Sequence, residues 1–299
     1  MNSAQTETGG GRNPPADAEV LQSCEEIAWR LSRDVIRMTT RAGSGHPSSS
    51  LSAIDVLTVL YFGGILQYDP DRPARPDRDR FILSKGHGAP GLYAVLAEAG
   101  YFDAGDLMTL RETGSPVEGH PNMRRLPGLE ASTGSLGQGL SIGLGHALGA
   151  RLSDSRYRVY VMIGDGEADQ GQVWEAAMSA AKYGVSNLTA ILDRNGFQQT
   201  GPIDRVMPAL EPIREKWEAF GWQVFDIDGH AQDQVLAAFK AAQSVPDRPQ
   251  LVIARTKKGR GLSPFEADHV NRKHGKALDP EEAEQALEEL DAQHEQASA

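Results

Sequence analysis

Two short apolar runs near the middle of the chain constrain its fold more than any other feature. Residues 159–163 (VYVMI) lead into a Gly-Asp-Gly turn that carries Asp165, and residues 188–192 (LTAIL) lead into Asn195. Between them, residues 172–183 have the spacing of a helix. A strand, a helix and a second strand within about 30 residues form the usual right-handed crossover of a parallel sheet.

This crossover has a chemical consequence for Asp165 and Asn195. If the two strands are neighbours about 4.8 Å apart, their C-terminal ends hold a carboxylate and a carboxamide side by side. Mg²⁺ prefers such oxygen ligands and usually shares them with a substrate phosphate. Ligands of open α/β sheets gather at the carboxyl ends of strands. The pattern therefore predicts a site where a metal ion bridges to a diphosphate.

The rest of the chain alternates in the same way, which predicts an α/β fold. We expect a doubly wound, mostly parallel sheet with helices on both faces. Helix patterns cover 20–42, 51–62, 89–99, 103–111, 137–152, 172–183, 209–220 and 231–243, and strand patterns cover 80–84, 158–163, 188–193, 222–227 and 250–255. We further expect a disordered arm over 1–18, a single domain over 19–280, and an acidic helix or tail over 281–299.

Composition narrows the classes of partner and compartment. The 299 residues carry a net charge of −11, which argues against a nucleic acid or an anionic membrane as partner. A single cysteine, Cys24, leaves no intrachain disulfide and fits the cytoplasm. Neither a membrane-spanning stretch nor a signal-peptide pattern is evident in the sequence. We therefore expect a cytoplasmic protein.

Four histidines lie in glycine-rich motifs that indicate loops. His46 lies in GSGHP, His87 in SKGH after a predicted strand, His120 in GHP within an irregular segment, and His274 in HGK. Taken singly, each of these motifs also fits an ordinary surface loop. Residues 132–139 (STGSLGQG) add a further glycine-rich loop before a helix, although this loop is not a dinucleotide-binding fingerprint. Ordinary roles are expected for the other four histidines, which are His146, His230, His269 and His294.

Taken together, these motifs resemble those of the transketolases. GDG, the correctly spaced Asn195, and the AGSGHP, SKGH and GHP segments match the family, and the resemblance extends from Val20 to Leu278. More narrowly, the chain resembles the N-terminal subunit of a split, two-chain transketolase. The resemblance implies the thiamine diphosphate-binding fold of the PP type. It also implies transfer of a two-carbon ketol unit from a ketose phosphate to an aldose.

The resemblance also implies a role for each motif residue. The metal ligands would be Asp165, Asn195 and the backbone carbonyl of Phe197, with Mg²⁺ or Ca²⁺ as the ion. The other cofactor contacts would be His87, Gly134, Leu136, Gly166, Glu167 and His274. The sugar contacts would be His46, His120 and His274, and the catalytic residues would be His46, His87, His120 and Glu175. The basic residues Lys257, Lys258 and Arg260 would lie near phosphates.

One position departs from the family pattern. Gln170 stands where transketolases usually carry a glutamate of an acid network that links two active sites. Glutamine cannot hold or pass a proton in the same way. Asp169 is one residue away and could substitute, and Glu175 matches the next acidic position of the pattern. The departure leaves coupling between sites open and does not affect the expected metal site.

The resemblance also implies a missing partner. In this family the glutamate that activates the cofactor comes from the pyrimidine domain, so we expect a separate C-terminal subunit that supplies it in an α₂β₂ assembly. Two alternatives remain. One is a component of a transketolase-like or 2-oxo-acid dehydrogenase E1-type enzyme that delivers a two-carbon unit to a lipoyl or acyl-carrier thiol. The other is a non-catalytic or regulatory subunit.

Overall fold

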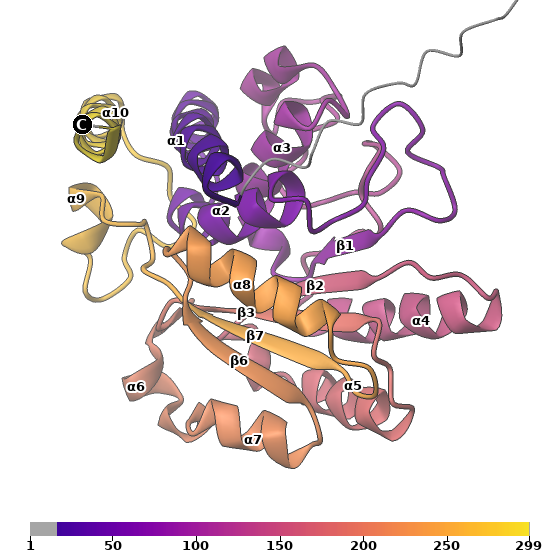
Figure 1. Ribbon diagram of the computed structural model, residues 1–299. Coiled ribbons are helices and arrows are strands. Elements are labelled where there is room, and N and C mark those ends of the chain that lie inside the picture. Colours follow the sequence, from indigo (N-terminus) through magenta and orange to yellow (C-terminus); the bar gives the residue numbers. More distant parts are fainter. Residues whose placement is uncertain (1–16, 299) are drawn as a thin grey trace, which may run out of the picture.

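A five-stranded parallel sheet forms the centre of the computed structural model, which describes residues 17–298 (Figure 1). Its strands, in spatial order, are β1 (Arg80–Leu83), β2 (Val159–Gly164), β3 (Leu188–Arg194), β7 (Gln250–Arg255) and β6 (Gln223–Asp228). All neighbouring pairs are parallel. Each strand lies within one residue of its predicted bounds. The central strands β2, β3 and β7 are runs of residues buried on both faces, which are easily recognised in a sequence.

The helices cover both faces of the sheet, as predicted (Figure 1). They are α1 (Asp17–Ala42), α2 (Pro47–Phe62), α3 (Ala89–Glu98), α4 (Gly139–Leu152), α5 (Gly171–Lys182), α6 (Ile203–Val206), α7 (Ile213–Ala219), α8 (Gln232–Gln243), α9 (Ser263–Glu266) and α10 (Pro280–Ser298). Short 3₁₀ helices are η1 (Gly86–Gly88), η2 (Ala104–Thr109), η3 (Glu167–Asp169) and η4 (Pro208–Leu210). The α/β fold class is confirmed.

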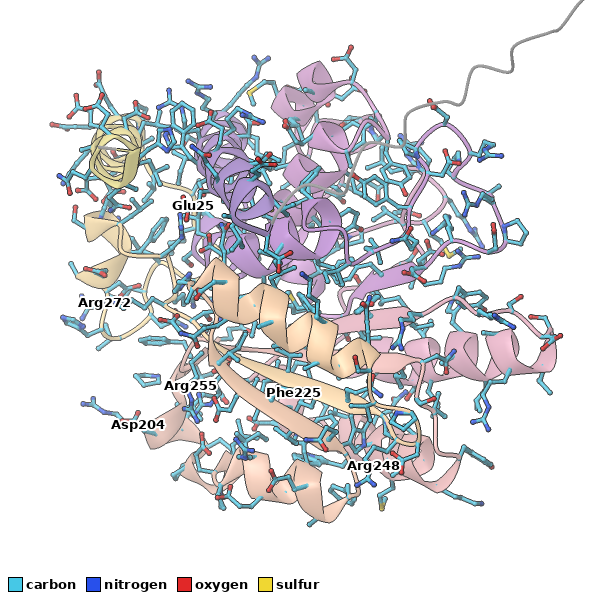
Figure 2. The ribbon with its side chains drawn as sticks, in the orientation of Figure 1. Glu25, Asp204, Phe225, Arg248, Arg255 and Arg272 are labelled. Atoms are coloured by element: carbon cyan, nitrogen blue, oxygen red, sulfur yellow. The ribbon has the colours of Figure 1, made fainter. Side chains whose placement is uncertain are left out.

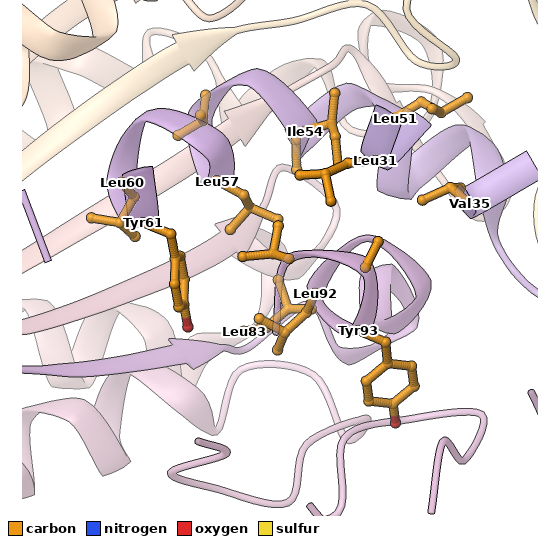
Figure 3. Packing of buried hydrophobic residues seen from close by; sticks show 14 of the residues in the cluster. Leu31, Val35, Leu51, Ile54, Leu57, Leu60, Tyr61, Leu83, Leu92 and Tyr93 are labelled. Atoms are coloured by element: carbon orange, nitrogen blue, oxygen red, sulfur yellow. The ribbon is translucent and has the colours of Figure 1, made fainter. Parts of the chain in front are cut away.

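Alternate residues of the strands point into two separate cores. Tyr160 and Met162 of β2 pack with α1, α2, α3 and α8, whereas Val161 and Ile163 pack with α4, α5 and α7. In Figure 3, Leu57 of α2 packs among the leucines of the first core. Helix α2 is enclosed on all sides, since every residue from Pro47 to Tyr61 is buried. This enclosure fixes the N-terminus of α2, where the predicted site begins.

Several predicted boundaries are wrong for local reasons. Helix α2 begins at Pro47 rather than at residue 51, because proline is well suited to the first turn of a helix. The segment predicted as a helix over 103–111 is the 3₁₀ helix η2, and Asp103 caps it by accepting from the Gly105 N–H. Helix α7 begins at Ile213 rather than at residue 209, after two prolines.

The predicted ends of the chain are only partly described. The disordered arm expected over 1–18 falls mostly outside the described residues, but α1 already begins at Asp17. The acidic C-terminal segment is helix α10, which extends to Ser298. The elements that were not predicted are the small hairpin of β4 (Phe197–Gln198) and β5 (Gly201–Pro202), the single turns α6 and α9, and the 3₁₀ turns η1 and η3. No helix between residues 17 and 298 has the length and apolar character needed to cross a bilayer.

Two glycines of α4 allow a test of how closely this helix packs on the sheet. A Cβ at Gly143 would lie 2.3 Å from the Val161 side chain, whereas a Cβ at Gly145 meets nothing within 4 Å. We expect Gly143→Ala to lower the free energy of unfolding by about 1–3 kcal/mol through overpacking. Gly145→Ala should raise it by about 0.5–1 kcal/mol through helix propensity. Urea unfolding of both variants measures this difference, and an equal gain in stability from both would contradict the packing described.

Candidate functional site

The candidate site lies at the carboxyl ends of β1, β2 and β3. In the register of the sheet, Gly164 of β2 is paired with Asp193 of β3, so Asp165 and Asn195 follow neighbouring strands at the same edge. The Gly196 N–H donates to Asp165 Oδ2 over 2.7 Å, which joins the two loops directly. The structure therefore brings together the two residues around which the site was predicted.

Asp165 is a buried carboxylate with one engaged and one free oxygen. Its Oδ2 accepts from Gly196 and, over 2.9 Å, from the Arg194 guanidinium. Its Oδ1 accepts no hydrogen bond from residues 17–298. Burial, and next the charge of Asp193, raise the pKa of Asp165 to about 6. A cation at the free oxygen would relieve both effects.

Asp193 of β3, two residues before Asn195, forms a fully buried ion pair with Lys85. Lys85 also donates to the Ser49 carbonyl of α2 over 2.9 Å. Burial alone would raise the pKa of Asp193, but the charge of Lys85 and the hydrogen bonds from Lys85, Ser52 and Thr256 together hold it below its usual value. The Asn195 amide donates to Asp193 over 3.1 Å and accepts from the Phe197 N–H over 3.1 Å. The ion pair thus fixes the orientation of Asn195.

Three of the four motif histidines form a cluster. The ring centroid of His46 lies 5.3 Å from that of His87 and 5.1 Å from that of His274, and the last two are 5.7 Å apart. Burial is the main reason that their pKa values are low, about 3 for His46, about 4 for His274 and well below the usual value for His87. Neighbouring positive charges lower them further. At neutral pH these imidazoles are uncharged.

The fourth motif histidine, His120, borders the cluster. A Cβ at Gly134 would lie 3.0 Å from the His120 ring, so the glycine-rich loop lies against it. The pKa of His120 is lowered by burial and by Arg111. Leu136, in the same loop, is half-buried. The loop therefore approaches the histidines at Gly134.

Three predicted site residues, Glu167, Glu175 and Gly166, are not part of the histidine cluster. The carboxylate oxygens of Glu167 accept from Ser84, Gly137 and Gly164, whereas its contact with a cofactor stays a prediction. Glu175 is exposed on α5 and engages Ser179 only through its backbone oxygen. Gly166 lies against Gln198, where a Cβ would come within 2.5 Å. Glycine is therefore required at this turn.

Lys258 links the hairpin to the histidine cluster. Its ammonium lies 2.9 Å from His274 Nδ1 and 5.5 Å from the centre of the Phe197 ring. Burial, and next the charge of Lys85, lower the pKa of Lys258 to about 8. A cavity of about 340 Å³ lies beside it, with Asn195 and Phe197 in its wall. The basic cluster expected near phosphates thus reaches the site through Lys258.

Sequence reasoning missed a second buried carboxylate network, which is centred on Asp55 of α2. Asp55 is fully buried and accepts from His230 over 2.8 Å and from Arg260. The other ring nitrogen of His230 accepts from the Lys257 N–H over 2.8 Å. His230, expected to be an ordinary loop residue, therefore holds the segment that carries Lys258. No short motif marks it, because its partners come from three distant segments.

The polar atoms around the site fit a polar ligand. Four buried atoms there have no hydrogen-bond partner in the described residues: His46 Nδ1, Ser48 Oγ, Thr133 Oγ1 and Gln198 Oε1. No three His, Cys, Asp or Glu side chains between residues 17 and 298 form a ready metal cage. A cation here would therefore use Asp165 together with amide, carbonyl and ligand oxygens. These are the ligands that Mg²⁺ and Ca²⁺ accept.

Comparison with known proteins identifies relatives of the whole fold. The family described as "Transketolase, thiamine diphosphate binding domain" matches residues 25–297. The 6-deoxy-6-sulfo-D-fructose transketolase subunit of Clostridium sp. (strain MSTE9) is 42% identical over 244 residues, which cover 80% of this chain and 88% of that protein. An apulose-4-phosphate transketolase subunit of Phocaeicola vulgatus is 38% identical over 270 residues, covering 90% of this chain and 94% of that one.

Longer relatives match over part of their length only. Transketolase-like protein 2 of Bos taurus is 41% identical over 278 residues, which cover 93% of this chain but 44% of that protein. The crystal structure of the transketolase from Campylobacter jejuni superposes with a TM-score of 0.81 at 29% identity, over 91% of this chain and 43% of the other. The chain thus spans less than half the length of these transketolases.

The Lys85–Asp193 pair allows a test of the site's foundation. We expect Lys85→Met to lower the free energy of unfolding by about 3–5 kcal/mol, because it leaves a buried carboxylate without its partner. The double variant Lys85→Met/Asp193→Asn should recover part of this loss. As a control, Lys240→Met breaks an exposed pair with Asp17 and should cost at most about 1 kcal/mol. Equal losses in Lys85→Met and Lys240→Met, measured by urea unfolding, would rule out the ion pair as a foundation.

The charge of the histidine cluster allows a second test. An ordinary histidine takes up a proton between about pH 8 and pH 5. Because burial lowers the pKa of His46 to about 3, its ring should stay neutral throughout this range. NMR of the ¹⁵N-labelled chain, with His46→Gln to assign the signal, should show ring nitrogen shifts that do not move between these pH values. A midpoint near pH 6.5 would contradict the burial of this ring.

Proposed function

The chain belongs to the transketolase family, and on that basis we propose that it is the diphosphate- and metal-binding subunit of a two-chain transketolase. The reaction would move a two-carbon ketol unit from a ketose phosphate to an aldose. One observation carries the proposal: the free oxygen of Asp165, the fixed amide of Asn195 and three neutral histidines meet at one edge of the sheet. This set suits a metal-bound diphosphate beside a sugar.

The polar end of the site would hold the cofactor. Asp165, Asn195 and the Phe197 carbonyl would bind Mg²⁺ or Ca²⁺ together with diphosphate oxygens. His87, in η1 after β1, would donate to the diphosphate, and Lys258 would add positive charge. Gly134 and Leu136 would contact the aminopyrimidine through their backbone. Thiamine diphosphate, when bound, supplies the reactive carbon that carries the two-carbon unit.

The histidines would handle the sugar. His46 and His274 lie next to each other, and His120 borders them through Gly134. A neutral imidazole has one donor and one acceptor nitrogen, so each ring can orient a hydroxyl and move a proton. His46 Nδ1 is buried without a partner and would find one in a substrate hydroxyl. Low pKa values keep these rings in the useful neutral form at pH 7.

A second chain would complete the enzyme. Two of the relatives that this chain nearly spans are named as transketolase subunits. We infer that a pyrimidine-domain subunit brings the carboxylate that activates the cofactor, in an α₂β₂ assembly. Glu175, which is exposed on α5, would then act at a contact between subunits rather than beside the histidines.

Reconstitution tests the proposed function. The chain and a pyrimidine-domain partner would be mixed with thiamine diphosphate and Mg²⁺, and aldose release from a ketose phosphate would be measured. Activity should require both chains, the cofactor and the ion. Cofactor binding without ketose cleavage would reject transketolase activity and turn the test to 2-oxo acids and thiol acceptors. Failure of the assembled complex to bind thiamine diphosphate would reject the catalytic role altogether.

Loss of a metal ligand should have a large effect in the same assay. Asp165→Asn removes the charge of the predicted ligand, and we expect activity and ion affinity to fall at least about 10- to 100-fold. Substitution of a residue that only hydrogen-bonds to a metal ligand already has an effect of this size. Asp204→Asn is the matched control, because Asp204 is exposed on α6 at the surface (Figure 2). Equal activity of the two variants would remove Asp165 from the metal site.

A further inference from the structure

Glu167 is a buried carboxylate that accepts three hydrogen bonds from the protein. It begins η3, and its carboxylate is 1% exposed. Oε1 accepts from the Ser84 hydroxyl and, over 2.8 Å, from the Gly137 N–H. Oε2 accepts from the Gly164 N–H over 3.1 Å. One carboxylate therefore joins the end of β1, the end of β2 and the glycine-rich loop before α4.

The connection continues through Ser84. The Ser84 hydroxyl, which donates to Glu167, also accepts from the Gly139 N–H over 3.0 Å. Loop 133–139 is thus bonded at two points, at Gly137 by Glu167 and at Gly139 by Ser84. All of these groups are buried, so water cannot replace a bond that is lost.

Loop 133–139 is also packed closely against its neighbours. A Cβ at Gly139 would lie 2.3 Å from the Ser84 side chain, and a Cβ at Gly86 would lie 2.6 Å from the Gly134 backbone nitrogen. The loop therefore touches the segment 84–88, which carries His87. Gly134 lies in loop 133–139 and His87 in segment 84–88. A small change at Glu167 would move the loop against this segment and so alter the spacing between Gly134 and His87.

The donors around Glu167 show that it serves the protein rather than a ligand. All three groups at its oxygens donate hydrogen bonds, so both oxygens must act as acceptors. Burial raises the pKa of Glu167, while these hydrogen bonds and the charge of Lys85 oppose the rise. Lys85 itself is bonded to Asp193. The carboxylate is held by the loops that it connects, and each of its oxygens already accepts a hydrogen bond from the protein.

We propose that Glu167 is a positioning residue that holds loop 133–139 at the spacing from His87 which the cofactor requires. The inference rests on the proposed function, in which this loop contacts the aminopyrimidine and His87 contacts the diphosphate. Glu167 acts through the loop and touches neither the cofactor nor the sugar. Its loss should therefore weaken cofactor binding much more than turnover by the loaded enzyme.

Two substitutions separate hydrogen bonding from charge. Glu167→Met keeps the approximate size and removes every acceptor. Glu167→Gln removes the charge but keeps one oxygen, which can still accept from Ser84 and Gly137. If the loop is held by hydrogen bonds, glutamine should recover part of what methionine loses, because its NH₂ group cannot accept from the Gly164 N–H. Glu215→Met is the matched control, because Glu215 is exposed on α7.

The first measurement is hydrogen exchange of the full chain without cofactor. In Glu167→Met, amides of residues 133–139 should exchange at least about tenfold faster, since an accepting partner of a buried N–H is gone. Strands β3 and β7 should keep their protection. Ser84→Ala should give a smaller effect in the same loop and replaces Glu167→Met if that variant fails to fold. Unchanged exchange in the loop would overturn the proposal without affecting the proposed function.

The second measurement uses the complex with the partner subunit. Thiamine diphosphate is titrated with Mg²⁺ at saturation, followed by intrinsic fluorescence, and turnover is measured at saturating cofactor. We expect Kd to rise about 10- to 100-fold in Glu167→Met and less in Glu167→Gln, with kcat within about threefold of the parent. Equal Kd values in parent and Glu167→Met would overturn the positioning role. No cofactor binding by the parent complex would overturn the proposed function and this role together.

Discussion

The buried ion pair between Lys85 and Asp193 is the contact on which the site depends. Lys85 follows β1 and Asp193 ends β3, so the pair bridges across β2 at the edge where ligands of such sheets bind. Both charges are out of water, and such a pair is stable only when its remaining hydrogen-bonding groups are satisfied. Ser49 and Ser52 of α2 and Thr256 after β7 supply these bonds. One pair thereby ties the sheet to the helix that presents His46.

The sequence predicted the sheet, and the edge at which Asp165 and Asn195 meet, for a simple physical reason. Strands that are buried on both faces are short continuous apolar runs, and the runs before Asp165 and Asn195 have this form. Parallel strands place their carboxyl ends together, so two polar residues that follow such runs must meet. The contact of Gly196 with Asp165 is the outcome. In this region the local sequence pattern is enough to predict which residues meet in the tertiary structure.

Other parts of the site could not be predicted because their partners lie far apart in the chain. Glu167 looks like any residue after a GDG turn, yet its role depends on Ser84 and Gly137. His230 lies in an ordinary loop, and only the fold brings Asp55 to it. The helix expected over 209–220 is the shorter α7 for a local reason, since it begins only after Pro212. Burial and long-range hydrogen bonds, rather than spacing, decide such residues.

The electrostatics of the site contrast with those of the whole chain and indicate what it is built to receive. The protein carries a net charge of −11, yet burial and neighbouring cations lower the pKa values of Lys258, His46 and His274 together. Burial is the largest cause of each shift and the neighbouring cations add to it, so positive charge gathers where an anion would be stabilised. A diphosphate bound there would raise these pKa values again, and its affinity would in turn depend on their protonation. A phosphate ligand would therefore meet Lys258 and the neighbouring Lys85 within a chain whose net charge is negative.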